Sequence, residues 1–231
     1  MIDRDLIFHC EQYMLDCLKN DMAHDPQHMY RVLKLAMDIA DHAENVNRDI
    51  LVVSCLLHDI GRKAQQEDPS LCHAEVGGKM AYQFLVQQGI DVETADAVRA
   101  AIQAHRFRSK HKPESIEAKI LFDADTIDAT GAMGIARSLQ YEGNGAIPIY
   151  NVDEAGNLLF GSIDQPDSFL REYEFKLKNL YDRLYTRRGR EIAQSRRLAA
   201  QQFCDALVGE IKEGHTTIHC VLNRLSKETN T

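Results

Sequence analysis

The chain has 231 residues, a length that suits one globular domain with a small appendage. With 44% hydrophobic and 27% charged residues it has an ordinary globular composition. Its net charge of −8 argues against stable nucleic-acid binding, because phosphate backbones attract basic surfaces. No apolar run approaches the roughly 20 residues of a membrane span, so we expect no membrane anchor and no signal peptide. The six cysteines form no CxxC pair and fit reduced thiols in a cytoplasmic protein.

The first part of the chain predicts two helices. Residues 2–20 place their apolar side chains on about one helical face. Asp25 and Pro26 form a helix-start signal, a capping side chain followed by proline in the first turn. In the helix that follows, His28 falls on the apolar stripe, although a lone core histidine more often bonds a backbone carbonyl. Arg31 fits either a salt bridge or a phosphate contact.

Residues 50–62, with the sequence ILVVSCLLHDIGR, are the stretch around which we expect the fold to be organised. The apolar run ends in His58 and Asp59, two adjacent groups that are costly to bury unless something binds them. Neutral imidazole beside an ionised carboxylate suits Mn, Fe, Ni or Zn, whereas hydrogen bonds alone are the alternative explanation. We expect Gly61 to end this helix in the left-handed conformation and residues 62–69 to form a polar loop.

Two further histidines belong to predicted helices. His73 is expected at the N-terminus of a helix that Gly89 closes. His105 falls on the apolar face of the next helix, which Asp91 caps. The basic segment 106–112 follows directly. Such a charge run is either a solvated face or a phosphate-binding segment, and the pattern leaves both open.

Residues 115–130 predict a deeply apolar helix that carries three aspartates, Asp123, Asp125 and Asp128. Carboxylates this close repel one another in a low-dielectric environment, and a nearby cation would remove the difficulty. A solvated helix face is the alternative. However, Asp123 and Asp125 lie about 200° apart around a helix, so at least one of them should point inward.

The last part of the chain predicts an insertion and two long helices. Residues 143–168 are rich in Gly, Asn, Asp and Pro and predict a long loop or small hairpin, which could cover the site. Amphipathic helices are expected over residues 169–184 and 190–211, separated by a turn at 187–189. We expect a single helical domain over residues 1–214 with a C-terminal extension at 215–231. Exposed parts of the two helices could support a homodimer.

His28, the pair His58–Asp59, and Asp125 stand in the order H…HD…D, which resembles the signature of the HD-domain phosphohydrolase superfamily. The resemblance spans about residues 20–205 through blocks such as HDPQHMYRV, LLHDIGRK, HAEVGGKMA and EAKILFDADTIDATGAMGIAR. These blocks look like a bacterial subfamily of uncharacterised hydrolases and nucleotide pyrophosphohydrolases. The resemblance implies an all-α HD-domain bundle, in agreement with the helical periodicity.

Carried over residue by residue, the resemblance implies the metal ligands and the positions of His73 and His105, and the mechanism expected from that ligand set adds the other site residues. It implies one divalent transition metal, with Mn²⁺ favoured over Co²⁺, Ni²⁺, Fe²⁺, Zn²⁺ or Mg²⁺. A histidine beside the metal would protonate the leaving oxygen, and basic side chains would offset charge on the phosphate. The metal ligands fall on His28, His58, Asp59 and Asp125; the catalytic group on His73, His105 and Asp128; and the substrate-binding group on Arg62, Lys63, Arg106 and Arg108.

The activity expected from this set is phosphohydrolysis of a small phosphorylated metabolite by attack of activated water on phosphorus. A nucleotide is the favoured substrate, which would make the protein a nucleoside triphosphate pyrophosphohydrolase or a nucleotidase. Two alternatives stay open. A di-iron HD-type oxygenase would use His73 and His105 as extra ligands, whereas a non-catalytic binding module would keep a metal only for stability.

Overall fold

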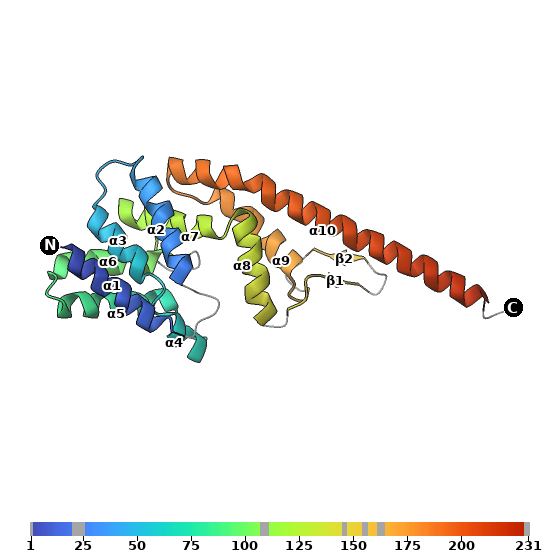
Figure 1. Cartoon of the computed structure of the whole chain (residues 1–231), viewed down its shortest axis with the longest axis horizontal. Helices are drawn as coiled ribbons and strands as arrows, with labels where there is room; N and C mark the ends of the chain where they lie inside the picture. The colour runs from blue at the N-terminus through green and yellow to red at the C-terminus, as the bar shows by residue number, and fades with distance from the viewer. Residues whose placement is uncertain are drawn as a thin grey trace. The chain divides into compact units, whose positions relative to one another are not determined.

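The computed structural model describes residues 2–19, 26–106, 111–144, 147–153, 157–160 and 165–228, with side chains throughout except in 141–144 and 215–228. Within these ranges the fold is all-α apart from one two-stranded hairpin, which confirms the expected fold class (Figure 1). None of the described helices is long and apolar enough to cross a membrane. The chain forms two compact units, Met1–Ala129 with Leu180–Ala193, and Thr130–Asn179 with Gln194–Thr231.

The first unit is a helical bundle. Short polar side chains begin four of its helices, since Asp3, Asn47, Asp91 and Ser115 each accept a hydrogen bond from the backbone N–H three residues later. The helices of this unit are α1 (Arg4–Cys17), α2 (Pro26–Ala40), α3 (Arg48–Leu57), α4 (Arg62–Glu67), α5 (His73–Gln87), α6 (Val92–Ala104) and α7 (Ile116–Asp128), together with the first residues of α10 (Arg187–Glu228).

Helix α3 contributes to both hydrophobic clusters of this unit. Val53 and Leu57 pack in the cluster that includes α1, α5 and α6, while Leu51 and Cys55 pack in the cluster that includes α2 and α7. Around it, α5 packs along α6 and α2 packs along α7 (Figure 1). Burial on two sides explains why the run from Ile50 to Leu57 is almost continuously apolar. The C-terminal end of α3 therefore lies inside the bundle.

The second unit contains α8 (Gly131–Asn144), β1 (Asn151–Val152), β2 (Leu158–Leu159), α9 (Phe169–Phe175) and the rest of α10. The two strands pair antiparallel with Asn151 opposite Leu159, so the segment expected as a loop or small hairpin does contain a hairpin. The Phe169 ring packs edge-to-face against Phe203 of α10. Phe169 and Leu170 of α9 are fully buried.

The structure corrects the expected helix boundaries after residue 168. The segment 169–184 is not one helix, because α9 ends at Phe175 and a 3₁₀ helix spans Leu177–Asp182. The Asn179 amide donates to the carbonyls of Glu174 and Phe175, which are acceptors that a continuing helix would have used. The expected turn at 187–189 is the first turn of α10. There the Thr186 hydroxyl accepts a hydrogen bond from the Gly189 N–H.

Helix α10 runs on to Glu228, so residue 214, where the expected domain ended, lies within a continuous helix. The division into a domain and an extension remains a prediction. Residues 62–69, expected as a loop, begin with α4 instead. No residue of α4 is buried, so the segment lacks the apolar periodicity that predicts a helix.

Gly61 was expected in the left-handed conformation, and this is wrong, because its φ is −84°. The glycine is needed for close packing instead. A Cβ at this position would lie 2.3 Å from the His73 carbonyl oxygen and 2.5 Å from the Gly77 nitrogen. The turn after Asp59 therefore rests directly on the backbone of α5.

Candidate metal centre

Four buried histidines converge inside the first unit from four different elements. Their side chains are almost wholly inaccessible to solvent. His28 lies in the first turn of α2 and His58 caps the C-terminus of α3, while His73 begins α5 and His105 follows the last residue of α6. The four histidines, which are distant in sequence, lie close together because the ends of α2, α3, α5 and α6 converge.

Each of these four rings is held from behind through its Nδ1 atom. The partners are oxygens that only accept hydrogen bonds, so we assign the proton to Nδ1 and a lone pair to Nε2. The four lone pairs therefore face inward. The contacts are His28 to Asp128 Oδ2 at 2.8 Å, His58 to the Cys55 carbonyl at 2.8 Å, His73 to Gln65 Oε1 at 2.6 Å and His105 to the Ile102 carbonyl at 2.6 Å.

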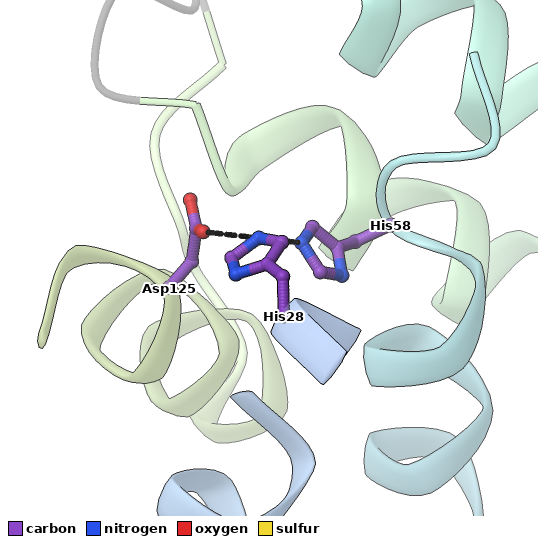
Figure 2. A group of neighbouring side chains, drawn as sticks. All are labelled: His28, His58 and Asp125. Carbon is purple, nitrogen blue, oxygen red and sulfur yellow. Dashed lines mark hydrogen bonds and ion pairs between the residues drawn. The ribbon is translucent and has the colours of Figure 1, made fainter. Parts of the chain in front are cut away.

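The first cluster consists of His28, His58 and Asp125, which point toward one another in Figure 2. The Nε2 atom of His28 lies 3.4 Å from Nε2 of His58 and 3.3 Å from Oδ1 of Asp125. The remaining separation, from His58 Nε2 to Asp125 Oδ1, is 3.9 Å. Two lone pairs and an anionic oxygen at these distances repel one another unless a cation lies among them.

Asp59 extends this cluster and joins it to the other two histidines. Its Oδ2 atom lies 3.7 Å from His28 Nε2 and 3.8 Å from His58 Nε2. Its Oδ1 atom lies 3.5 Å from His73 Nε2 and 3.6 Å from His105 Nε2. Among the described residues, Oδ2 of Asp59 and the Nε2 atoms of His73 and His105 have no hydrogen-bond partner, whereas Oδ1 of Asp59 forms an ion pair with Arg62. Buried polar atoms without a hydrogen-bond partner fit a metal or a substrate group.

The electrostatics hold these groups in the protonation states that bind metal ions. Burial would raise the pKa of Asp59, but the nearby Arg62 and His58 outweigh it and hold that pKa well below its usual range. Burial likewise opposes ionisation of Asp125, yet the neighbouring His28 and His58 side chains lower its pKa. Burial lowers the pKa of His58 to about 4 in spite of Asp59. At neutral pH Asp59 and Asp125 are therefore carboxylates and His58 is a neutral imidazole.

The three aspartates of α7 have three different partners. Asp125 faces the cluster. Asp123 accepts hydrogen bonds from the backbone N–H groups of Tyr185 and Thr186 and from the Thr186 hydroxyl. Burial raises the pKa of Asp123 against the effect of these donors. Asp123 thus holds the turn that precedes α10 and takes no part in the cluster.

Asp128 lies behind His28. Besides its contact with the imidazole, it receives two hydrogen bonds from Arg31, with Nε at 2.8 Å from Oδ1 and a terminal nitrogen at 3.0 Å from Oδ2. Of the two interpretations of Arg31, the structure therefore shows the salt bridge. Sequence reasoning missed Gln65, which holds His73, because the segment that contains it was expected to be a loop.

Of the expected substrate-binding residues, Arg62 and Arg106 lie near the cluster and Lys63 faces solvent. Arg62 Nε lies 2.9 Å from Asp59 Oδ1, and its side chain is 24% exposed. Arg106 donates to Cys72 Sγ at 3.4 Å, next to His73. Lys63 is 70% exposed and faces Glu67. Arg108 lies outside the described residues.

Comparison with known proteins identifies the family. The HD domain family model matches residues 27–130, a range that contains every member of the cluster. The uncharacterized protein YpgQ of Bacillus subtilis is 32% identical over 192 residues, which cover 81% of this chain and 84% of the relative. The chain belongs to the HD-domain family.

Solved structures agree with this membership of the HD-domain family. A protein from Lactobacillus plantarum matches with a TM-score of 0.74 at 25% identity, over 92% of this chain and 100% of that one. YpgQ in complex with ADP matches with a TM-score of 0.65 at 29% identity, over 87% and 97% of the two chains. An HD-superfamily hydrolase from Bacillus thuringiensis matches with a TM-score of 0.66 at 27% identity, over 90% and 97%. The Bacillus thuringiensis neighbour supports a hydrolase.

Proposed function

We propose that this protein is a metal-dependent phosphohydrolase that acts on a small phosphorylated metabolite, with a nucleoside triphosphate as the first candidate and a nucleoside monophosphate as the second. The observation that carries the proposal is the inward set of two imidazole lone pairs and two carboxylates from His28, His58, Asp59 and Asp125. The complex of the relative YpgQ with ADP supports a nucleotide as the ligand.

These donors suit a divalent transition metal, and we favour Mn²⁺ over Co²⁺, Ni²⁺, Fe²⁺, Zn²⁺ or Mg²⁺ because two nitrogens and two oxygens form a mixed, moderately hard set. When bound, such a cation activates water and polarises a phosphoryl oxygen. Asp128 orients His28 from behind, and Arg31 holds Asp128 in turn. Such supporting contacts keep a ligand's lone pair aimed at the site.

The remaining residues would bind and protonate the substrate. We place the phosphate against Arg62 and Arg106, because these two side chains lie beside the cluster whereas Lys63 faces solvent. His73 or His105 would contact the leaving oxygen through Nε2. Burial lowers the pKa of His73, so the ring is neutral in the free protein. The negative charge of a bound phosphate would have to stabilise its protonated form before it could protonate the leaving oxygen.

The test joins metal analysis to a substrate screen. Protein purified without chelator is analysed for metals, and release of phosphate and pyrophosphate is measured over nucleotides with Mn²⁺, Co²⁺, Ni²⁺ and Mg²⁺. We expect His58→Ala and Asp125→Ala each to lose both the metal and the hydrolysis. Lys63→Ala is the matched control and should keep the metal. Full activity in either of the first two variants would contradict the assigned site.

A di-iron oxygenase is the second candidate, and the position of His73 and His105 around Asp59 Oδ1 is the observation that favours it. Against it stands Arg62, whose guanidinium already contacts the same oxygen. Two iron ions per chain, oxygen consumption and no phosphate release would establish the oxygenase. A protein that keeps its metal but turns over none of these substrates would be the binding module.

A further inference from the structure

A second group of donors lies beside the proposed metal ligands. Oδ1 of Asp59 is approached at 3.5 Å by Nε2 of His73 and at 3.6 Å by Nε2 of His105. Both imidazoles are held through Nδ1 by acceptor oxygens, so lone pairs face an anionic oxygen here too. By its chemistry this group is suited to hold a cation, just as the first cluster is.

The chain supplies a cation at this position itself. Nε of Arg62 lies 2.9 Å from the same Oδ1 atom, closer than either histidine. The Arg62 N–H also donates to the Asp59 carbonyl at 3.0 Å, so the backbone turn fixes where its side chain starts. A guanidinium keeps its charge at every pH at which the protein is folded, unlike an imidazole or an amine.

We propose that Arg62 takes the place of a second metal ion at Asp59, His73 and His105, and thereby limits this site to one metal. The inference rests on the proposed function, because it requires the first metal at the neighbouring cluster. A divalent ion beside Oδ1 would meet the guanidinium at van der Waals distance, where like charges repel strongly in a buried site. His73 and His105 thus stay available to the substrate.

The experiment counts metals in variants of Arg62. The wild-type protein, Arg62→Leu and Arg62→Lys are titrated with Mn²⁺, and bound manganese is measured by elemental analysis after gel filtration. Electron paramagnetic resonance separates isolated Mn²⁺ from spin-coupled pairs. Leucine removes the charge without adding a ligand atom, whereas lysine keeps the charge.

We expect one manganese per wild-type chain, with any second ion bound at least roughly tenfold more weakly. Arg62→Leu should bind two as a coupled pair, and Arg62→Lys should bind one. The double variant Arg62→Leu/His105→Ala should return to one, because it lacks a donor of the second group. This pattern would establish the role of Arg62 by a readout that does not depend on activity.

Two results would overturn the inference while leaving the proposed function intact. One is a wild-type protein that binds two manganese ions with similar affinity. The other is a folded Arg62→Leu protein, with the circular dichroism of the wild type, that binds only one. If Arg62→Leu does not fold, Arg62→Ala carries the same expectation, because alanine likewise adds no ligand atom. A wild-type protein that binds no metal at all would contradict both the inference and the proposed function.

Discussion

His28 owes its orientation to a carboxylate 100 residues away in the chain. Asp128 accepts its Nδ1 proton on Oδ2 and receives Arg31 on both oxygens. Both oxygens of Asp128 therefore accept hydrogen bonds. The lone pair of His28 is thus directed into the cluster by a network that contains no ligand itself.

Changing Asp128 to asparagine should disturb this network without removing a ligand. One carboxylate oxygen becomes an NH₂ group, which must face either the Arg31 donors or the Nδ1 proton of His28. Either arrangement sets donor against donor or moves the histidine proton to Nε2. We expect affinity for Mn²⁺ to fall by roughly 10- to 100-fold, measured by calorimetric titration.

Asp123→Asn is the matched control, because it makes the same substitution on the same helix. Its carboxylate holds the turn at Tyr185 and Thr186. The control should unfold at a lower urea concentration than the wild type and keep wild-type affinity for manganese. Equal loss of metal affinity in both variants would count against a special role for Asp128.

At the scale of elements, the contact between the turn after α3 and the helix α5 positions half of the candidate site. Gly61 lies against the His73 carbonyl and Gly77, so the histidine that begins α5 is brought up to Asp59. No side chain fits between the two backbones. The packing of the turn against α5 therefore depends on the absence of a Cβ atom at Gly61.

Gly61→Ala should destabilise the protein by about 1–3 kcal/mol, because the two nearest atoms belong to backbone that cannot turn aside. Urea unfolding followed by circular dichroism measures the change. Gly209→Ala in α10 is the control, since a Cβ there meets nothing within 4 Å. Alanine is the better helix former, so the control should gain up to about 1 kcal/mol. A neutral effect at Gly61 would show that α5 can shift.

The start of α10 is joined to α2 by a two-point ion pair between Arg188 and Asp38. The hydrogen bond from Arg188 lowers the pKa of Asp38 below its ordinary value, more than burial raises it. A carboxyl with a lowered pKa in the folded state adds stability above the unfolded pKa and loses it as the pH falls through the folded value.

Arg188→Gln should therefore be slightly less stable than the wild type at pH 7, because the pair is partly exposed. The difference between the two proteins should shrink as the pH falls below about 4. Urea midpoints at a series of pH values provide the measurement. A difference that stays constant down to pH 3 would show that the Arg188 side chain contributes by packing and not by charge.

At the scale of the whole molecule, every described member of the candidate centre belongs to the first unit. The residues come from α2, α3, α5, α6 and α7, so unfolding of this unit disperses them. A metal bound there is bound only by the native state. Such a ligand adds to the free energy of unfolding in proportion to the logarithm of its concentration over its dissociation constant.

Removing the metal with a chelator should therefore lower the unfolding temperature. At a free metal concentration 100 times the dissociation constant, the stabilisation amounts to about 2.7 kcal/mol. Differential scanning calorimetry with and without chelator measures it. His58→Ala should unfold at the same temperature in both conditions. A chelator effect that persists in this variant would place the metal elsewhere.

Local pattern decided much of the fold. An apolar run such as residues 50–57 is costly to leave in water, so its local pattern predicted the burial of the run and of His58 and Asp59 at its end. Helix spacing put His28 and His105 on inward faces, and the structure buries both. Helix α4 and the break after α9 were not predicted. Short polar segments such as α4 have little periodicity, and the break after α9 depends on hydrogen bonds from the Asn179 side chain.

Only the tertiary structure decided which partner each buried polar side chain contacts. Three aspartates on one helix look alike in a local pattern, yet Asp123 holds a turn 62 residues away and Asp128 supports a ligand-type histidine 100 residues away. Likewise, the local pattern around Arg62 gives no sign of its contact with Asp59, which only the packed structure shows. The reason is physical. The spacing of apolar residues along the chain indicates which helix faces will be buried, whereas the partner of a buried charge depends on which distant element packs against it.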